Sequence, residues 1–419
     1  MRHTADDAGH DPDFLAVSRE TLDSALRSVP FLLRRLLKIA ARLPVGTLDI
    51  TLPDGRRLRF SGEEPEPRAV LMIHDAVCVR RLMIGGDLGF AESYLRGEWS
   101  SPDLNALLTL LATNQRAGEQ LTPGRPGLRI WQRIQHYFNR NSRSGSKRNI
   151  HAHYDLGNRF YETWLDDSMT YSSAIFAPGD NDLASAQRRK YQRLARETGI
   201  TTEHHVLEIG CGWGGFAEYA AREIGCRVTG LTISREQYDY ATKRIADAGL
   251  SDRVSIVMRD YRDEQARYDR IISIEMFEAV GEAYWEIFFR KMRECLVAGG
   301  RAGLQLITIR DEAFEIYRRE MDFIRAYVFP GGMLPTPQIM DNLAKRAGLP
   351  IISDQGFAPD YARTLASWRE RFEDAWPRVA PLGFDERFRR LWRYYLTYCE
   401  VGFATGNIDV RQMVLARPD

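Results

Sequence analysis

The 419-residue chain has little cysteine, no long apolar run and almost no excess of charge of one sign. Its five cysteines are scattered and form no Cys-x-x-Cys pair, which argues against a disulfide framework or a zinc site and favours a reducing cytoplasm. No stretch of about 18 uncharged apolar residues occurs, so we expect no transmembrane helix. With 58 basic and 57 acidic side chains, the chain lacks the basic excess typical of a nucleic-acid-binding protein.

The residues that are present are typical of a folded protein. Hydrophobic residues make up 44% of the chain and charged residues 27%, which is enough for a sizeable core. At roughly 150 residues per domain, the length indicates two or three domains. Residues 1–13 are polar and rich in aspartate, so we expect a loose tail there and no secretory signal.

Residues 14–112 are expected to form a small α+β domain. Apolar spacing from Leu15 to Val29 predicts one helix, and the segment 31–43 predicts a second. Alternation on both sides of Asp54-Gly55 predicts a hairpin over 47–60.

The segment around the second helix is basic. Residues 26–43 carry five basic and no acidic side chains, a pattern typical of a helix that docks on an anionic membrane surface. An ordinary surface helix packed on a core has the same pattern. Residues 113–149 follow as a basic linker, whose charges are either solvated or in contact with anionic lipid headgroups.

From about residue 200 the pattern changes to strands alternating with helices. Such alternation favours a doubly wound parallel sheet. We therefore predict an α/β fold, with a Rossmann-like domain over 150–419. The strands are expected at 205–209, 226–231, 254–258, 271–274 and 302–309, with helices at 214–224 and 234–248.

The strongest local signal is the glycine-rich turn after the first of these strands. Gly210, Gly212 and Gly214 permit positive φ angles and a close approach of ligand to backbone, at the sheet edge where α/β proteins bind nucleotides. The turn also satisfies Gly-x-Gly-x-x-Gly through Gly215, so NAD or FAD and a purely structural turn stay open as alternatives. Glu208 precedes the turn, and this anion suits a positively charged ligand better than a pyrophosphate.

Polar side chains follow the next two strands. Thr232, Ser234 and Gln237 are placed to contact a ribose or a carboxylate. Asp260 and Tyr261 follow the third strand, where a carboxylate can accept a hydrogen bond from an adenine and a ring can stack on it. A helix N-cap is the alternative role of Asp260.

The turn, hydrophobic-Glu-Ile-Gly-Cys-Gly-x-Gly-Gly, resembles motif I of class I S-adenosylmethionine (SAM) methyltransferases. Longer motifs resemble the cyclopropane-fatty-acyl-phospholipid synthase family over about residues 45–415, and the motif at 85–94 is similar to the family's bacterial long-chain branch. The other motifs lie at 150–158, 160–176, 275–281, 327–332, 360–365 and 394–399.

This resemblance implies a reaction and its partners. The methyl group of SAM is transferred to the double bond of an unsaturated acyl chain in a membrane phospholipid, and a cyclopropane ring closes after the resulting carbocation loses a proton. Family members use bound bicarbonate as the base. The resemblance also suggests a homodimer. Because the sequence shows neither a secretory signal nor a spanning helix, we expect a cytoplasmic protein that associates peripherally with the inner face of the membrane. Insertions near 311–340 and 360–400 are expected to form a lid over the acyl chain.

The resemblance also assigns roles to individual residues. Glu278 matches the glutamate that holds bicarbonate, and Tyr361 matches an active-site tyrosine. Each has a plainer alternative, Glu278 as a capping or ion-paired residue and Tyr361 as a core residue. The remaining assignments are Ser173 at the anion site, Ile309 at a matched catalytic position in the strand 304–309, Cys399 near the acyl pocket (or a small core residue), and Tyr171 and Ser172 closing over SAM.

Three positions depart from the best-known family members. Ser173 stands in place of a cysteine, Ile307 in place of a histidine, and Ala279 in place of another common histidine. A serine hydroxyl can still bind an anion, whereas an isoleucine side chain cannot. The anion site is therefore expected to be altered or lost, and a 1,2-hydride shift would then give a methylene or methyl branch in place of a ring.

Other hypotheses are a homologue that binds SAM or lipid without turnover, and a methyltransferase acting on a small soluble amine or phenol. The basic segments argue against the small acceptor. His151 and His153 have an extended spacing with no third ligand nearby, so we expect no metal.

Overall fold

The computed structural model describes residues 14–17, 21, 24, 26, 29–114, 156–180 and 182–419. These residues belong to two compact units. Residues 386–401 belong to the first unit with the N-terminal part of the chain, and residues 402–419 belong to the second. The expected tail, nearly all of the expected linker, and His151 and His153 lie outside the described residues. The domain limits expected from the sequence stay predictions.

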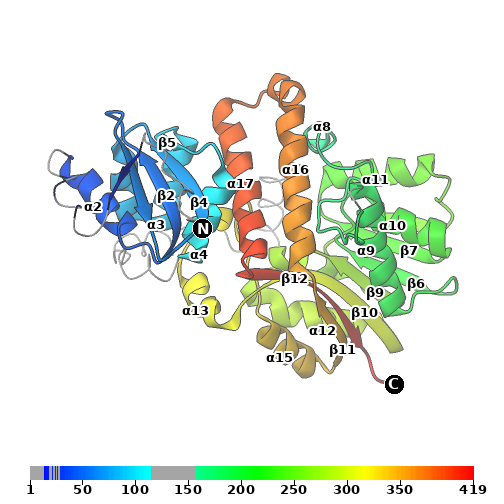
Figure 1. Ribbon diagram of the computed structural model, residues 1–419. Coiled ribbons are helices and arrows are strands. Elements are labelled where there is room, and N and C mark those ends of the chain that lie inside the picture. Colours follow the sequence, from blue (N-terminus) through cyan, green and yellow to red (C-terminus); the bar gives the residue numbers. More distant parts are fainter. Residues whose placement is uncertain are drawn as a thin grey trace, which may run out of the picture. The chain divides into compact units, whose positions relative to one another are not determined.

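The first unit is an α+β fold around a five-stranded sheet with the order β1-β3-β2-β4-β5 (Figure 1). Its elements are β1 (Leu15–Ala16), α2 (Phe31–Ala40), β2 (Val45–Thr51), β3 (Arg57–Ser61), β4 (Glu64–Ile73), α3 (Val77–Leu95), β5 (Trp99–Ser100), α4 (Leu104–Thr113) and the part of α17 (Glu386–Ala404) up to residue 401.

The expected hairpin is confirmed, because β2 and β3 are antiparallel with Ile50 opposite Leu58. In its turn, the carboxylate of Asp54 accepts a hydrogen bond from the backbone N–H of Arg56 at 3.1 Å. The helix expected from Leu15 is wrong at its start, since Leu15 and Ala16 form a strand that pairs in parallel with β3. Hydrogen bonds to the neighbouring strand determine the structure at these two residues, and the spacing of apolar residues along the chain gives no indication of such a partner.

Helix α2 confirms the expected helix within 31–43 and is amphipathic. Leu33, Leu37 and Ala40 are buried, while Phe31 is 68% exposed. The guanidinium of Arg35 lies 5.5 Å from the centre of the Phe31 ring. One face is therefore packed, and the other presents an aromatic ring together with a positive charge.

The second unit holds the predicted α/β domain. Its first half comprises α8 (Asn158–Tyr161), α9 (Leu183–Thr198), β6 (His205–Ile209), α10 (Gly215–Tyr219), a π-helix (Ala220–Ile224), β7 (Arg227–Thr232), α11 (Arg235–Asp247), β8 (Val254–Met258), a 3-10 helix (Tyr261–Asp263) and β9 (Tyr268–Ile274). Its second half comprises 3-10 helices (Phe277–Ala279, Glu282–Tyr284), α12 (Trp285–Cys295), β10 (Leu296–Ile309), α13 (Asp311–Arg319), α14 (Phe323–Tyr327), α15 (Pro337–Ala347), β11 (Ile351–Gly356), α16 (Ala358–Val379), a 3-10 helix (Ala380–Leu382) and β12 (Ile408–Ala416).

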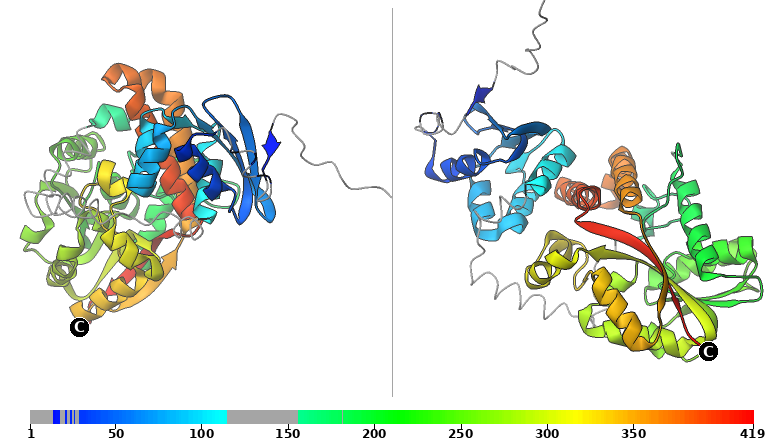
Figure 2. Two further views of the ribbon diagram at one scale, coloured as in Figure 1. Left: turned by 90° about the vertical axis from the view of Figure 1, so that its left-hand side faces the viewer. Right: turned by 60° about the horizontal axis from the view of Figure 1, so that its bottom comes forward.

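The sheet of this unit has the order β11-β12-β10-β9-β6-β7-β8. Strands β6 to β10 are parallel, and β12 runs antiparallel to both β10 and β11. In Figure 2 the long red strand β12 runs beside β10. The order reverses between β6 and β9, and such a switch point is where open α/β sheets bind ligands. The α/β fold expected from the sequence is confirmed.

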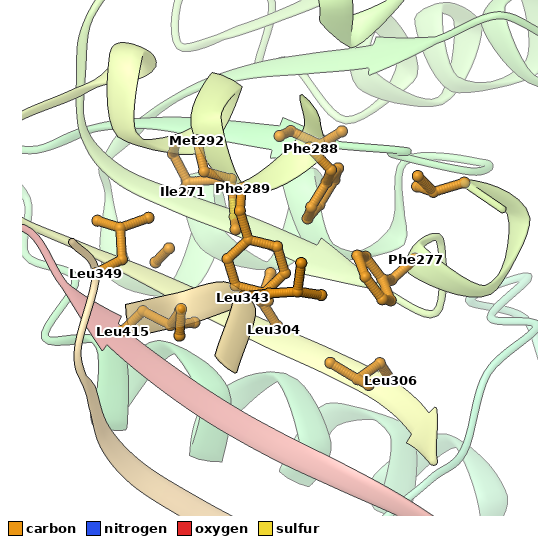
Figure 3. Packing of buried hydrophobic residues seen from close by; sticks show 14 of the residues in the cluster. Ile271, Phe277, Phe288, Phe289, Met292, Leu304, Leu306, Leu343, Leu349 and Leu415 are labelled. Atoms are coloured by element: carbon orange, nitrogen blue, oxygen red, sulfur yellow. The ribbon is translucent and has the colours of Figure 1, made fainter. Parts of the chain in front are cut away.

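Apolar cores hold the helices to the sheet. One core joins α12 and α15 to β9, β10 and β12; Figure 3 shows Phe277, Phe288 and Phe289 packed among aliphatic side chains of these elements. A second core joins α9, α10 and α11 to β6, β7 and β8, with Leu194 and Val228 wholly buried. The two cores fix the strand ends from which the site is built.

Within the described part of the chain, no helix has the length and apolar character needed to cross a membrane. The same residues contain no group of three or more potential metal-binding side chains.

Candidate active site

The glycine turn lies directly at the switch point of the sheet. Gly210, Gly212 and Gly214 all have positive φ, at 82°, 52° and 83°. A Cβ on Gly210 would come within 2.7 Å of the Met276 side chain, whereas a Cβ on Gly212 would meet nothing within 4 Å. The turn is thus packed against the residues after β9 on one side and open at Gly212.

Glu208, on β6, is almost completely buried at 3% exposure. Its Oε2 atom has no hydrogen-bond partner. Burial raises the pKa of this carboxyl well above its ordinary value, while the backbone N–H of Ala217 and the charge of Lys190 act in the opposite direction. An unpartnered buried carboxyl oxygen is costly unless a ligand satisfies it.

The polar residues after β7 bind one another. The hydroxyl of Thr232 donates to Gln237 Oε1 at 2.9 Å and accepts from the backbone N–H of Ser234 at 3.1 Å. Ser234 caps α11 by accepting from the N–H of Gln237 at 3.3 Å. The structure therefore brings the three predicted residues together, and this network also shapes the start of the helix.

The residues after β8 have a partner of their own. The carboxylate of Asp260 accepts hydrogen bonds from Arg262, at 2.9 Å from Nε and 2.5 Å from Nη2, and caps the following 3-10 helix. The Tyr261 ring packs edge-on against Phe288 at 5.3 Å. The capping alternative for Asp260 is observed, and its role toward an adenine stays a prediction.

A series of aromatic rings leads away from the glycine turn. Trp213 contacts Tyr161 with ring centres 5.0 Å apart, and Tyr161 contacts Tyr171 at 5.4 Å. Tyr171 contacts Trp368 at 5.2 Å, and Trp368 contacts Tyr361 at 6.1 Å. The segment carrying Tyr171 is thereby joined both to the turn and to helix α16.

Glu275 is the centre of a buried polar cluster at the end of β9. Its Oε1 accepts hydrogen bonds from the backbone N–H of Ser173 and from Gln305 Nε2, both at 2.8 Å. Its Oε2 accepts from the Tyr361 hydroxyl at 2.6 Å. Burial raises the pKa of Glu275, and the charge of Lys190 is the largest opposing influence.

Glu278 lies one turn further along the chain. Its Oε1 accepts from the backbone N–H of Ile307 at 2.5 Å, and its Oε2 is buried without a partner. Burial raises the pKa of Glu278 to about 8, and the neighbouring charge of Glu275 adds to the shift. This pKa leaves Glu278 mainly neutral near pH 7, whereas the charge of Lys190 and the three hydrogen-bond donors act to lower the pKa of Glu275 and so favour its ionised form.

Lys190, on α9, is wholly buried. Its ammonium donates to the Ser172 hydroxyl at 2.6 Å. Burial lowers the pKa of this lysine to about 7, while the charges of Glu275, Asp166 and Glu208 act in the opposite direction. One cation thus lies within the electrostatic reach of both the Glu208 and the Glu275 carboxyls.

The other residues assigned by resemblance are placed as follows. The Ser173 hydroxyl donates to the backbone oxygen of Ala174 at 3.0 Å. The N–H of Ile309 donates to the Pro335 oxygen at 3.0 Å, and its side chain lies in the core shared with α12. Cys399 is on α17 within the first unit. The catalytic roles of these residues stay predictions.

Sequence reasoning missed Glu275, Lys190 and Gln305. Glu275 could have been found, because it directly follows a predicted strand of a parallel sheet, at the ligand-binding edge. Lys190 and Gln305 carry no local signal, since only the packing of α9 and β10 brings them to Glu275.

The sheet order and the glycine turn place a ligand site at the switch point, and the comparisons with known proteins identify the chain as a SAM-dependent methyltransferase. The family model described as mycolic acid cyclopropane synthetase matches residues 141–413. The chain belongs to this family, which includes the cyclopropane-fatty-acyl-phospholipid synthases.

Three known proteins show the extent of the similarity. Tuberculostearic acid methyltransferase of Mycobacterium tuberculosis is 40% identical, over 92% of this chain and 90% of that protein. Cyclopropane-fatty-acyl-phospholipid synthase of Escherichia coli K12 is 34% identical, over 81% and 85%. The crystal structure of mycolic acid cyclopropane synthase CmaA1 complexed with SAH and CTAB has a TM-score of 0.62 and 29% identity, covering 64% of this chain and 98% of that one.

The site of this chain suits SAM on two observations. The turn is open at Gly212, where an added Cβ would meet nothing, so a ligand can approach the backbone there. The unpartnered oxygen of Glu208 offers a hydrogen-bond acceptor to a ligand that carries an ammonium and a sulfonium, and a bound cation would in turn favour the ionised form of this carboxyl. A pyrophosphate carries no donor for this oxygen and would disfavour its ionised form.

Proposed function

We propose that this protein transfers the methyl group of SAM to a double-bond carbon in an unsaturated acyl chain of a membrane phospholipid. Two relatives support this substrate class, because one is named for tuberculostearic acid and the other for a fatty-acyl phospholipid. The observation that carries the proposal is the position of Glu275 and Glu278 at the strand end that packs on the glycine turn. Methylation of an alkene leaves a carbocation that must lose a proton, and a buried carboxylate is suited to accept it.

Residues of the chain are proposed to bind SAM and to stabilise the carbocation. SAM supplies an electrophilic methyl group bound to a positively charged sulfur. The glycine turn and Glu208 are proposed to hold it, with Tyr171 and Ser172 covering it. The faces of rings such as Tyr171 and Trp368 can stabilise a cation without attacking it. A phenol or amine acceptor needs no such series of rings, which favours the acyl substrate.

The product depends on which bond the released electrons form. Loss of a proton from the new methyl group closes a ring if its electrons attack the cationic carbon. If a hydride first shifts to that carbon, the same loss gives an exocyclic methylene. We favour the methylene product, because the relative aligned over 92% of the chain is named a methyltransferase and Ile307 and Ala279 depart from the ring-forming pattern. The ring is the second candidate, supported by the cyclopropane synthase relative.

The test is to incubate the purified chain with methyl-labelled SAM and vesicles of monounsaturated phospholipid. We expect label in the released fatty acids and vinylidene proton signals in their NMR spectrum. Upfield cyclopropane protons would support the second candidate. Label that stays outside the lipid fraction, although SAM binds, would contradict the proposal and favour a different acceptor or a homologue without turnover.

We also propose that the exposed face of α2 docks the protein on the inner, cytoplasmic surface of the membrane. Phe31 and Arg35 are adjacent on that face, and Leu32 is 37% exposed. An exposed ring beside a basic group can insert at the headgroup level while the charge attracts anionic lipid.

The double variant Phe31→Ser with Arg35→Glu is expected to weaken binding to anionic vesicles by about 100-fold or more. The loss combines ~2 kcal/mol for an inserted aromatic ring with ~1 kcal/mol for a surface charge. Vesicle sedimentation at low salt measures it. The matched control is Ile352→Ser with Arg227→Glu in the second unit, where both residues are exposed. Equal weakening by both variants would contradict the role of α2.

A further inference from the structure

Glu275 has an unusual backbone conformation for its residue type. Its φ is +48°, and among the described non-glycine residues only Met169 is also positive. A residue with a Cβ is strained in this left-handed region, and such strain persists only where the surroundings hold it. Here the N–H of Glu275 donates to the Gln305 backbone oxygen at 2.7 Å, and its side chain accepts three hydrogen bonds.

The three donors to the Glu275 carboxylate come from three separate parts of the second unit. Ser173 belongs to the segment before α9, Gln305 to β10 and Tyr361 to α16. Gln305 is fixed in turn, because its Oε1 accepts from Gln412 Nε2 on β12 at 3.0 Å. A carboxylate held by this many groups has a single orientation and keeps it through a reaction.

The position of Glu275 fits a direct role in the chemistry. The next residue, Met276, packs on Gly210 of the glycine turn. Lys190 supplies a buried positive charge that favours the ionised form of Glu275, and donates to Ser172 beside Ser173. The carboxylate thus lies between the glycine turn, which Met276 contacts, and Tyr361, the last ring of the series that starts at Trp213.

We propose that the Glu275 carboxylate is the proton acceptor of this methyltransferase, so that the chain carries its own base and does not use bicarbonate. This inference rests on the proposed function. In the step, a C–H bond of the transferred methyl group breaks and the proton passes to a Glu275 oxygen. The released electron pair forms a carbon–carbon σ bond to the cationic carbon, which closes a ring, or, after the hydride shift has moved the cation to the methyl-bearing carbon, the π bond of a methylene. Because proton loss from a carbocation is strongly downhill, orientation matters more than basicity, and a weak base suffices.

A bound bicarbonate does not fit the residues present. An anion needs hydrogen-bond donors, and the Tyr361 hydroxyl and the Ser173 N–H already donate to Glu275. The N–H of Ile309 donates to Pro335, and the Ser173 hydroxyl to Ala174. The N–H of Ile307 donates to Glu278, and a protonated Oε2 of Glu278 would be a single donor, which is too few to hold an anion. The nearby carboxylate of Glu275 would also repel a second anion.

The experiment compares the full-length native protein with Glu275→Gln and Glu275→Gly in bicarbonate-free buffer and with bicarbonate added. We expect the native rate of lipid methylation to change less than about two-fold with bicarbonate. Glu275→Gln should lower the rate by about 100-fold or more, the size of a general-base contribution, with an unchanged dissociation constant for SAM. Glu275→Gly, which relieves the strained φ and frees the three donors, should regain at least about ten-fold on addition of bicarbonate.

Binding of ¹³C-labelled bicarbonate to the protein without SAM gives a readout independent of turnover. Saturable NMR line broadening is expected with Glu275→Gly and not with the native protein. The matched control is Glu286→Gln, because Glu286 is a surface residue paired with Arg346. A native rate that requires bicarbonate, or a Glu275→Gln rate above a tenth of native, would overturn the inference. Failure of the proposed function is distinct, since then no label would enter lipid with the native protein either.

Discussion

Replacing Gly212 with aspartate is expected to weaken SAM binding by about 100-fold or more, while the protein stays folded. Aspartate tolerates the left-handed backbone better than most residues, and a Cβ at Gly212 would meet nothing within 4 Å. The fold therefore accommodates the new side chain. The carboxylate would instead occupy the opening through which a ligand approaches the turn, and a 100-fold loss corresponds to ~2.7 kcal/mol of binding free energy.

Isothermal titration with SAM measures this effect, and thermal unfolding of the unliganded protein checks the fold. Gly249→Asp is the matched control, because Gly249 has a φ of +67° and equally open surroundings but lies after α11, away from the turn. We expect the control to bind SAM as the native protein does. A Gly212→Asp protein with native affinity would mean that the cofactor does not approach the backbone at this glycine.

Replacing Lys190 with methionine is expected to change how the free energy of unfolding depends on pH. In the folded protein burial lowers the pKa of Lys190 from 10.5 to about 7. Below pH 7 the ammonium is charged in the folded and unfolded chains, and the cost of burying it applies in full. Between about pH 7 and 10.5 the unfolded chain holds the proton and the folded chain does not, so native stability rises with pH. Lys190→Met lacks this rise.

The variant should therefore lose stability relative to the native protein as the pH increases, by about 3 kcal/mol between pH 7 and 9.5. Denaturant unfolding of both proteins at several pH values measures the difference. Lys243→Met serves as control, because Lys243 is 76% exposed and paired only at the surface with Asp247. A pH-independent difference between the native protein and Lys190→Met would show that this ammonium keeps its proton throughout the range.

The Lys190→Met variant is also expected to change how the reaction rate depends on pH. Without the Lys190 charge, which is the largest influence lowering the pKa of Glu275, that carboxyl should ionise only at higher pH. The acidic limb of the pH–rate profile of Lys190→Met is therefore expected to move to higher pH.

The parts of this protein that could be predicted from sequence are those determined by a few neighbouring residues. The strand 205–209 and the strand 254–258 have the predicted limits, because a short, mainly apolar segment followed by a glycine or polar turn is a local signal. Glu208 and the three glycines were identified for the same reason. The pairing of Leu15 with β3 could not be read locally, since two residues acquire strand structure only from their neighbour.

The centre of the site was less accessible to sequence reasoning. The resemblance pointed to Glu278 as the central carboxyl of the site. In the structure it is Glu275 that accepts a hydrogen bond from the Tyr361 hydroxyl. Lys190 lies on a helix with a polar composition, and nothing in its neighbours indicates that it is wholly buried. Gln305 and Gln412 meet because β10 and β12 pair in register, although they are separated by more than a hundred positions in the chain.

The place of β12 in the sheet has a consequence for the making of the protein. Strand β11 joins the sheet only through β12, and β12 also carries Gln412, which fixes Gln305 and through it the Glu275 carboxylate. Residues 408–416 follow Glu275 and Gln305 by more than a hundred positions in the chain, yet the orientation of the Glu275 carboxylate depends on them. The reaction centre therefore reaches its final geometry only when β12 has paired with β10, at a late stage of folding of the second unit.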